Sequence, residues 1–159
     1  MARRKGLSIS EHDWRQLTAA LDGTEWHSTW LDQLFQASVP QVPGIYMLHT
    51  FPQTMSDVFS LPSEVSGVLY VGRTSKLRTR FIQHASVHNT NERIRQFSSI
   101  FGRLRFSFTR PSTTSALTID NWMRDAEHTL IKVLDPPANR VMPAASAVSG
   151  KIGKPVAVA

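Results

Sequence analysis

The chain has 159 residues, which is enough for one domain, or one domain with short arms. Its apolar content of 41% supports a single core, and no apolar run approaches the roughly 18 residues that a membrane span needs. The basic N-terminus has no apolar stretch behind it, unlike a secretory signal. The absence of Cys excludes disulfides and thiolate metal sites and agrees with a cytoplasmic protein. From the missing apolar run we expect no membrane partner.

Positive charge is concentrated in the middle of the chain. The net charge is +6, and half of the 18 basic residues lie between Arg73 and Arg110, where Glu92 is the only acid. Such a block indicates a polyanionic partner, nucleic acid first, although a merely soluble surface is the alternative. The residues that we expect to bind nucleic acid are Arg73, Lys76, Arg78, Arg103 and Arg105.

The first 40 residues are predicted to be a basic arm followed by a helical extension. Apolar residues recur at helical spacing over residues 10–22 and again over 25–37, and the two segments together contain three of the four Trp residues. This helical pair would pack on the main domain, and a dimer interface is the alternative. Pro40 and Pro43 then mark the start of a new unit over residues 41–142, and residues 143–159 are predicted to be a flexible tail.

The central unit is predicted to alternate strands with helices. Gly44–His49 and residues 68–72 form a wide hairpin around a long connection over 50–67. In the strand over 103–110, Leu104, Phe106 and Phe108 alternate inward, with Arg103, Arg105 and Ser107 outward. Helices are predicted over residues 76–87, 91–101 and 118–134, and Asp135-Pro136-Pro137 ends the last.

Three charged or titratable side chains are predicted to face inward. Arg80 and His84 share the apolar arc of one helix, and Glu127 lies within the apolar stripe of another. A buried charge is costly unless it is paired, so these positions indicate a site. One carboxylate with water and phosphate oxygens suits a divalent metal, an Arg can hold a phosphate, and a phenol or imidazole can accept a proton. These are the parts of a phosphodiester hydrolase.

Six elements in chain order resemble the GIY-YIG nuclease family over about residues 42–141. They are Gly44-Ile45-Tyr46, Tyr70-Val71-Gly72, Arg80, His84, Glu127 and Asn139. The resemblance implies an α+β fold with a small three-stranded antiparallel sheet flanked by helices. It implies a DNA endonuclease with one divalent metal, Mg²⁺ or Mn²⁺, held by Glu127.

The resemblance also implies roles for the other residues. Tyr70 or Tyr46 would accept the proton of the attacking water, and Arg80 would stabilise charge growing on the phosphate. His84 would orient a Tyr or serve the proton transfer, and Asn139 would hydrogen-bond the frame of the site. Arg73 is placed to favour the Tyr phenolate.

Other interpretations stay open at these positions. The two Tyr residues could be strand aromatics, and Glu127 could pair with an inward Arg. Tyr46 and Tyr70 are 24 residues apart, so an insertion separates the strands. The alternatives to a DNA endonuclease are a catalytically inactive nucleic-acid-binding module and an RNase or toxin-like nuclease. Cutting both strands would favour a homodimer.

Overall fold

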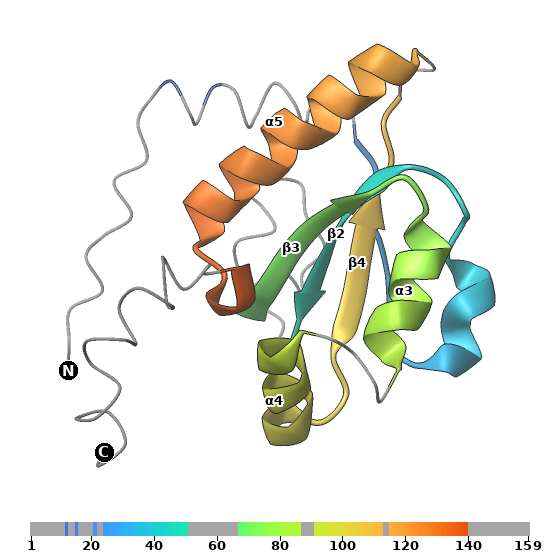
Figure 1. Ribbon diagram of the computed structural model, residues 1–159, viewed down its shortest axis with the longest axis vertical. Coiled ribbons are helices and arrows are strands. Elements are labelled where there is room, and N and C mark those ends of the chain that lie inside the picture. The colour runs from blue at the N-terminus through green and yellow to red at the C-terminus, as the bar shows by residue number, and fades with distance from the viewer. Residues whose placement is uncertain are drawn as a thin grey trace, which may run out of the picture.

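The computed structural model describes His12, Arg15, Leu21 and residues 24–50, 67–86, 91–112 and 115–139. Within these residues, one antiparallel sheet has four strands in the order β1-β4-β2-β3 (Figure 1). The strands are β1 (His27–Trp30), β2 (Gly44–His49), β3 (Val68–Thr74) and β4 (Arg105–Thr109). The predicted α+β class is confirmed, but the prediction of three strands was wrong by one.

The additional strand, β1, comes from the segment that was predicted to be a helix over residues 25–37. His27 to Trp30 pair with Phe108 to Arg105 of β4, and a 3-10 helix, η1 (Gln33–Ser38), follows. The helix prediction was wrong because apolar spacing in a short segment does not distinguish the two structures, and pairing with β4 satisfies the backbone of this one. His12, Arg15 and Leu21 are helical, and the remainder of the predicted helix over 10–22 lies outside the described residues.

The predicted helices of the central unit are confirmed with small shifts at their ends. They are α3 (Leu77–Ala85), α4 (Glu92–Phe101) and α5 (Ala116–Leu134), and a short 3-10 helix, η3 (Pro137–Asn139), follows α5. Asn91 caps α4 by accepting a hydrogen bond from the backbone of Ile94. Asp135 ends α5 in the left-handed conformation, with φ of 44°. No described helix is both long and apolar enough to cross a bilayer.

The sheet has a hydrophobic core on each face. Ile45, Met47 and Val71 pack against α5, whereas Tyr46 and Leu48 belong to the core that contains residues of α3 and α4. Figure 1 shows α5 and α3 on opposite sides of the strands. This division follows from the alternation of side chains along each strand, so neighbours in the sequence of β2 or β3 serve opposite faces.

The strands β2 and β4 are central, and this changes the prediction for residues 103–110. Ser107 was expected to point outward, but it is fully buried and lies 2.6 Å from Nε2 of His49. A central strand is covered on both faces, so its polar side chains must find partners inside the protein. Of the predicted connection over 50–67, residues 51–66 lie outside the described residues, as does the predicted tail over 143–159.

Candidate active site

Three rings from three elements meet on the α3 face of the sheet. The hydroxyl of Tyr46 lies 2.9 Å from Nε2 of His84. The ring of Tyr70 is centred 6.0 Å from that of Tyr46 and 5.6 Å from that of His84. Phe106 of β4 stacks on the other side of Tyr46 at 5.1 Å. The structure therefore brings the two predicted Tyr residues and the predicted His into one cluster.

Burial sets the protonation of this cluster. It raises the pKa of Tyr46 far above the ordinary value, and the adjacent Tyr70 raises it further, so the phenol stays protonated. The pKa of His84 is lowered to about 4, first by burial and then by the positive charge of Arg80. The imidazole is therefore neutral at pH 7. In the tautomer that carries its proton on Nδ1, Nε2 of His84 accepts the hydrogen bond that Tyr46 donates.

Arg80 lies at the rim of the cluster, and its predicted inward position was wrong. Leu77 and Phe81 of α3 are buried, but Arg80 is exposed. It is at the edge of the apolar arc, where a long side chain can keep its guanidinium in water. Its charge still lowers the pKa values of Tyr46 and His84. Arg80 can thus meet a phosphate at this rim without the cost of an unpaired buried cation.

Gly72 makes room for the hydroxyl of Tyr46, which is buried. The two residues are opposite each other in the β2–β3 pair, and a Cβ at position 72 would collide with the hydroxyl of Tyr46. Gly44, at the start of β2, is similarly crowded by the backbone oxygen of Thr109 and by Leu77. Gly72 is therefore required for close packing against Tyr46, and Gly44 for close packing against Thr109 and Leu77.

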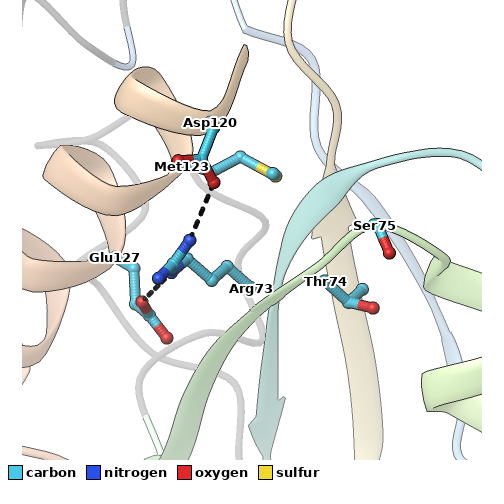
Figure 2. A pocket seen from close by; sticks show the side chains of 6 residues that line it. All are labelled: Arg73, Thr74, Ser75, Asp120, Met123 and Glu127. Atoms are coloured by element: carbon cyan, nitrogen blue, oxygen red, sulfur yellow. Dashed lines mark hydrogen bonds and ion pairs between the residues drawn. The ribbon is translucent and has the colours of Figure 1, made fainter. Parts of the chain in front are cut away.

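Glu127 lies on the other side of β3, where α5 packs. Its Oε2 accepts a hydrogen bond of 2.8 Å from Nε of Arg73, and Nη1 of Arg73 lies 3.1 Å from Oδ1 of Asp120 (Figure 2). Arg73, Asp120 and Glu127 line a cavity of about 470 Å³ together with Thr74, Ser75 and Met123. Glu127 thus has the Arg partner that the simpler interpretation of the sequence anticipated.

The ion pairs of Arg73 also correct the expectation that Arg73 favours the Tyr phenolate. Among the charges that act on Tyr46, the cation that lowers its pKa is Arg80, whereas Arg73 is directed toward α5 and its two carboxylates. The two sides of β3 are nevertheless coupled, because the charge of Glu127 is one of the smaller causes that raise the pKa of Tyr46.

The donor set at Glu127 fits a single hard cation. Its side chain is 23% exposed at the cavity, and only Oε2 is bonded to Arg73, so Oε1 makes no hydrogen bond within the described chain. Mg²⁺ is commonly held by one or two carboxylates with water and phosphate oxygens as its other ligands. In the described ranges, no cluster of three or more His, Asp or Glu side chains forms a fuller cage.

Asp120 is the residue of this cavity that the sequence-based prediction missed. It holds Nη1 of Arg73 through Oδ1 and Arg124 through Oδ2, at 3.1 and 2.7 Å. Asp120 precedes Glu127 by two helical turns and so lies on the same face of α5. That spacing is the signal that could have found it.

Asn139 supports β3 from η3. Its Oδ1 accepts a hydrogen bond from the backbone N–H of Val71, and its Nδ2 donates to the backbone oxygen of Val71, both at 2.7 Å. Because β3 is an edge strand, these groups have no neighbouring strand on that side. Asn139 therefore fixes the strand segment that lies between Tyr70 and Gly72.

The five residues predicted to bind nucleic acid have different surroundings. Arg73 is paired as described above, Arg78 donates to the backbone oxygen of Val39, and Arg103 pairs with Asp32 at 3.0 Å. Arg105 donates to Ser28 and lies 4.8 Å from the ring centre of Trp30. Lys76 is exposed at the start of α3, and within the described residues its ammonium group makes no ion pair. The structure does not gather these five side chains into one patch.

Comparison with known proteins found no relative of this chain. The chain matches none of the protein-family models, curated proteins or solved structures with which it was compared.

Proposed function

We propose that this protein is a divalent-metal-dependent endonuclease of the GIY-YIG type that hydrolyses phosphodiester bonds of DNA. The observation that carries the proposal is the 2.9 Å contact between the Tyr46 hydroxyl and Nε2 of His84, next to Gly72 and to the exposed Arg80. A phenol bonded to a neutral imidazole is a proton-transfer pair, and a guanidinium at its rim supplies the charge that a phosphate requires.

The Tyr46–His84 pair offers a route for the proton of an attacking water. Water gives its proton to the Tyr46 oxygen as the water oxygen attacks phosphorus, and the Tyr46 proton moves to Nε2 of His84. The bond between phosphorus and the leaving oxygen breaks as the new bond forms. The protein around Tyr46 disfavours a free phenolate, so the transfer to His84 accompanies the attack. A bound phosphodiester anion next to Arg80 offsets the positive charge that lowers the pKa of His84, which makes the imidazole a better acceptor.

Arg80 and Glu127 complete the proposed site from the two sides of β3. Arg80 donates hydrogen bonds to the phosphate oxygens on which charge grows during attack. Glu127 would hold the metal through Oε1 while Arg73 keeps Oε2 in place. When bound there, the metal supplies charge stabilisation to the leaving oxygen. Asp120 positions Arg73 and thus acts on Glu127 indirectly.

One observation favours the alternative of a catalytically inactive binding module. Arg73 already neutralises the carboxylate of Glu127, as in an ordinary structural ion pair. The two functions differ in one result, because an inactive module binds DNA without cutting it under any divalent metal.

The test is conversion of supercoiled plasmid to nicked or linear forms by the full chain. We expect cutting with Mg²⁺ or Mn²⁺, none with excess chelator, and a loss of at least about a hundredfold in Arg80→Ala and Glu127→Ala. The matched controls are Gln83→Ala on α3 and His128→Ala on α5, both exposed neighbours of the altered residues. Binding without cutting, or cutting by both site variants at the wild-type rate, would contradict the proposal. Replacing the plasmid with single-stranded RNA tests the RNase alternative in the same assay.

A further inference from the structure

A second cavity lies next to the Tyr cluster and shares His84 with it. This α3–α4 cleft has a volume of about 390 Å³ and is formed by the end of α3, one side of α4 and the segment that leads into β4. Its apolar lining includes Leu31, Ile94 and Leu104. The volume is within the range of about 300–1,000 Å³ that is usual for ligand pockets.

The polar groups of the cleft have the chemistry of a nucleotide site. Arg95 and Arg103 line it with the hydroxyl of Ser98, and no acidic residue is among its described lining residues. Arg103 is paired with Asp32, whereas within the described chain Arg95 is exposed and makes no ion pair. A guanidinium can pair with a phosphate, and both guanidinium and imidazole planes can stack on a nucleobase.

We propose that the α3–α4 cleft binds one unpaired nucleotide next to the phosphate that is cut. The inference rests on the proposed function, because His84 lines both the cleft and the proposed catalytic cluster. A nucleotide whose phosphate lies at Arg80 and Tyr46 has its neighbour within reach of the cleft. The base packs on the apolar lining and against His84, and Arg95 holds the phosphate that follows it.

The cleft distinguishes unpaired from paired substrates. A base inside a duplex is stacked and paired, so it must leave the helix before it can enter a protein pocket. That cost is lowest where the nucleotide is bulged, mismatched or single-stranded. The protein is therefore expected to select nucleic acid with an unpaired nucleotide beside the cleavage position, so recognition depends on local structure more than on base sequence.

The test measures binding in excess chelator, so that nothing is cut. The probes are two short DNA duplexes that share one strand carrying a single 2-aminopurine. The second strand either pairs with all of the first or lacks the nucleotide opposite 2-aminopurine, which is then bulged. We expect the wild-type chain to bind the bulged duplex at least about tenfold more tightly and to change the 2-aminopurine fluorescence. Ser98→Trp fills the cleft and Arg95→Gln removes the charge of the lining Arg that has no ion pair within the described chain, so both variants should lose most of this preference. Gln96→Trp, on the exposed side of α4, is the matched control and should keep it.

The outcomes separate this inference from the proposed function. Equal binding of the two duplexes by the wild-type chain overturns the cleft proposal, and so does a preference that survives in Arg95→Gln. The Arg95 variant changes an exposed residue and therefore remains informative if Ser98→Trp does not fold. A strong preference in a protein that never cuts DNA with any divalent metal supports the cleft and contradicts the nuclease.

Discussion

The neutral imidazole of His84 connects the chemistry of the site to the stability of the fold. Its pKa of about 4 in the folded protein lies below the value near 6.5 of an unfolded chain. Between these two pH values the unfolded state binds more protons than the folded state. The stability that His84 contributes is therefore complete above pH 6.5 and is lost as the pH falls toward 4.

His84→Gln should remove this part of the pH dependence, because Gln stays neutral and its side-chain oxygen can still accept from Tyr46. Each pKa unit corresponds to about 1.4 kcal/mol, so the shift contributes up to about 3 kcal/mol between pH 7 and 4. Urea unfolding at several pH values measures it as the difference between wild type and variant. Parallel stability curves across this range would show that the imidazole is not held neutral.

At the residue scale, the sequence predicted which residues form the Tyr cluster better than it predicted the burial and the partners of Arg80 and Glu127. Tyr46, Tyr70 and His84 meet as expected because strand and helix periodicity fix which face each occupies. The exposure of Arg80 could not be predicted, because a residue at the edge of an apolar arc can turn either way. The partner of Glu127 comes from a strand 54 residues earlier in the chain, and a contact of that range needs the fold.

The strand β3 is the element that joins the two halves of the site. It carries Tyr70 toward α3 and Arg73 toward α5, and Gly72 between them makes room for the buried Tyr46 hydroxyl. A side chain at position 72 would force Tyr46 away from His84. The single Gly thus determines whether the proton-transfer pair can form at an edge strand.

Gly72→Ala should therefore destabilise the protein by about 1–3 kcal/mol, the usual cost of overpacking. The free energies of unfolding of Gly72→Ala, of Tyr46→Leu and of the double variant together give the interaction energy between positions 72 and 46. Because Leu is smaller than Tyr, the double variant should cost less than the sum of the two single costs. Strictly additive costs would mean that the new methyl group does not meet Tyr46.

Asn139→Ala should loosen β3 at Val71. It removes both 2.7 Å hydrogen bonds to that residue, with a loss of about 1–3 kcal/mol. The amide of Val71 should then exchange with solvent faster, which hydrogen-exchange NMR detects. Asn139→Asp is the matched control, since it keeps an acceptor for the Val71 N–H and loses only the donor. Unchanged protection of Val71 in the Ala variant would rule out this role.

The positions of helices and strands could be predicted where a periodic apolar pattern extends over many residues. They could not be predicted where pairing with a distant strand determines the structure. The helices over residues 77–85, 92–101 and 116–134 follow from apolar periodicity and from their capping and terminating residues. The strand β1 does not, because its four residues become a strand only by pairing with β4. The burial of Ser107 follows from the same pairing, which makes β4 a central strand.

At the scale of the described molecule, the four-stranded sheet has the Glu127 carboxylate on one face and the Tyr46–His84 pair on the other, and β3 is its edge strand between them. In the proposed function, metal binding by one carboxylate and proton transfer by the Tyr–His pair act on the same phosphate. The proposed site therefore needs the residues of both faces. A change on one side should therefore remove most of the activity that the other side supports.

The most direct test is the single-turnover rate of cutting one labelled DNA strand with Mg²⁺, measured for wild type, Tyr46→Phe, Glu127→Gln and the double variant. If both faces form one site, each single change lowers the rate about a hundredfold or more. The double variant should then be no slower than about tenfold below the worse single, because groups that act as a unit are not additive. A single-variant rate within about threefold of wild type, with folding intact, would contradict a site shared across β3.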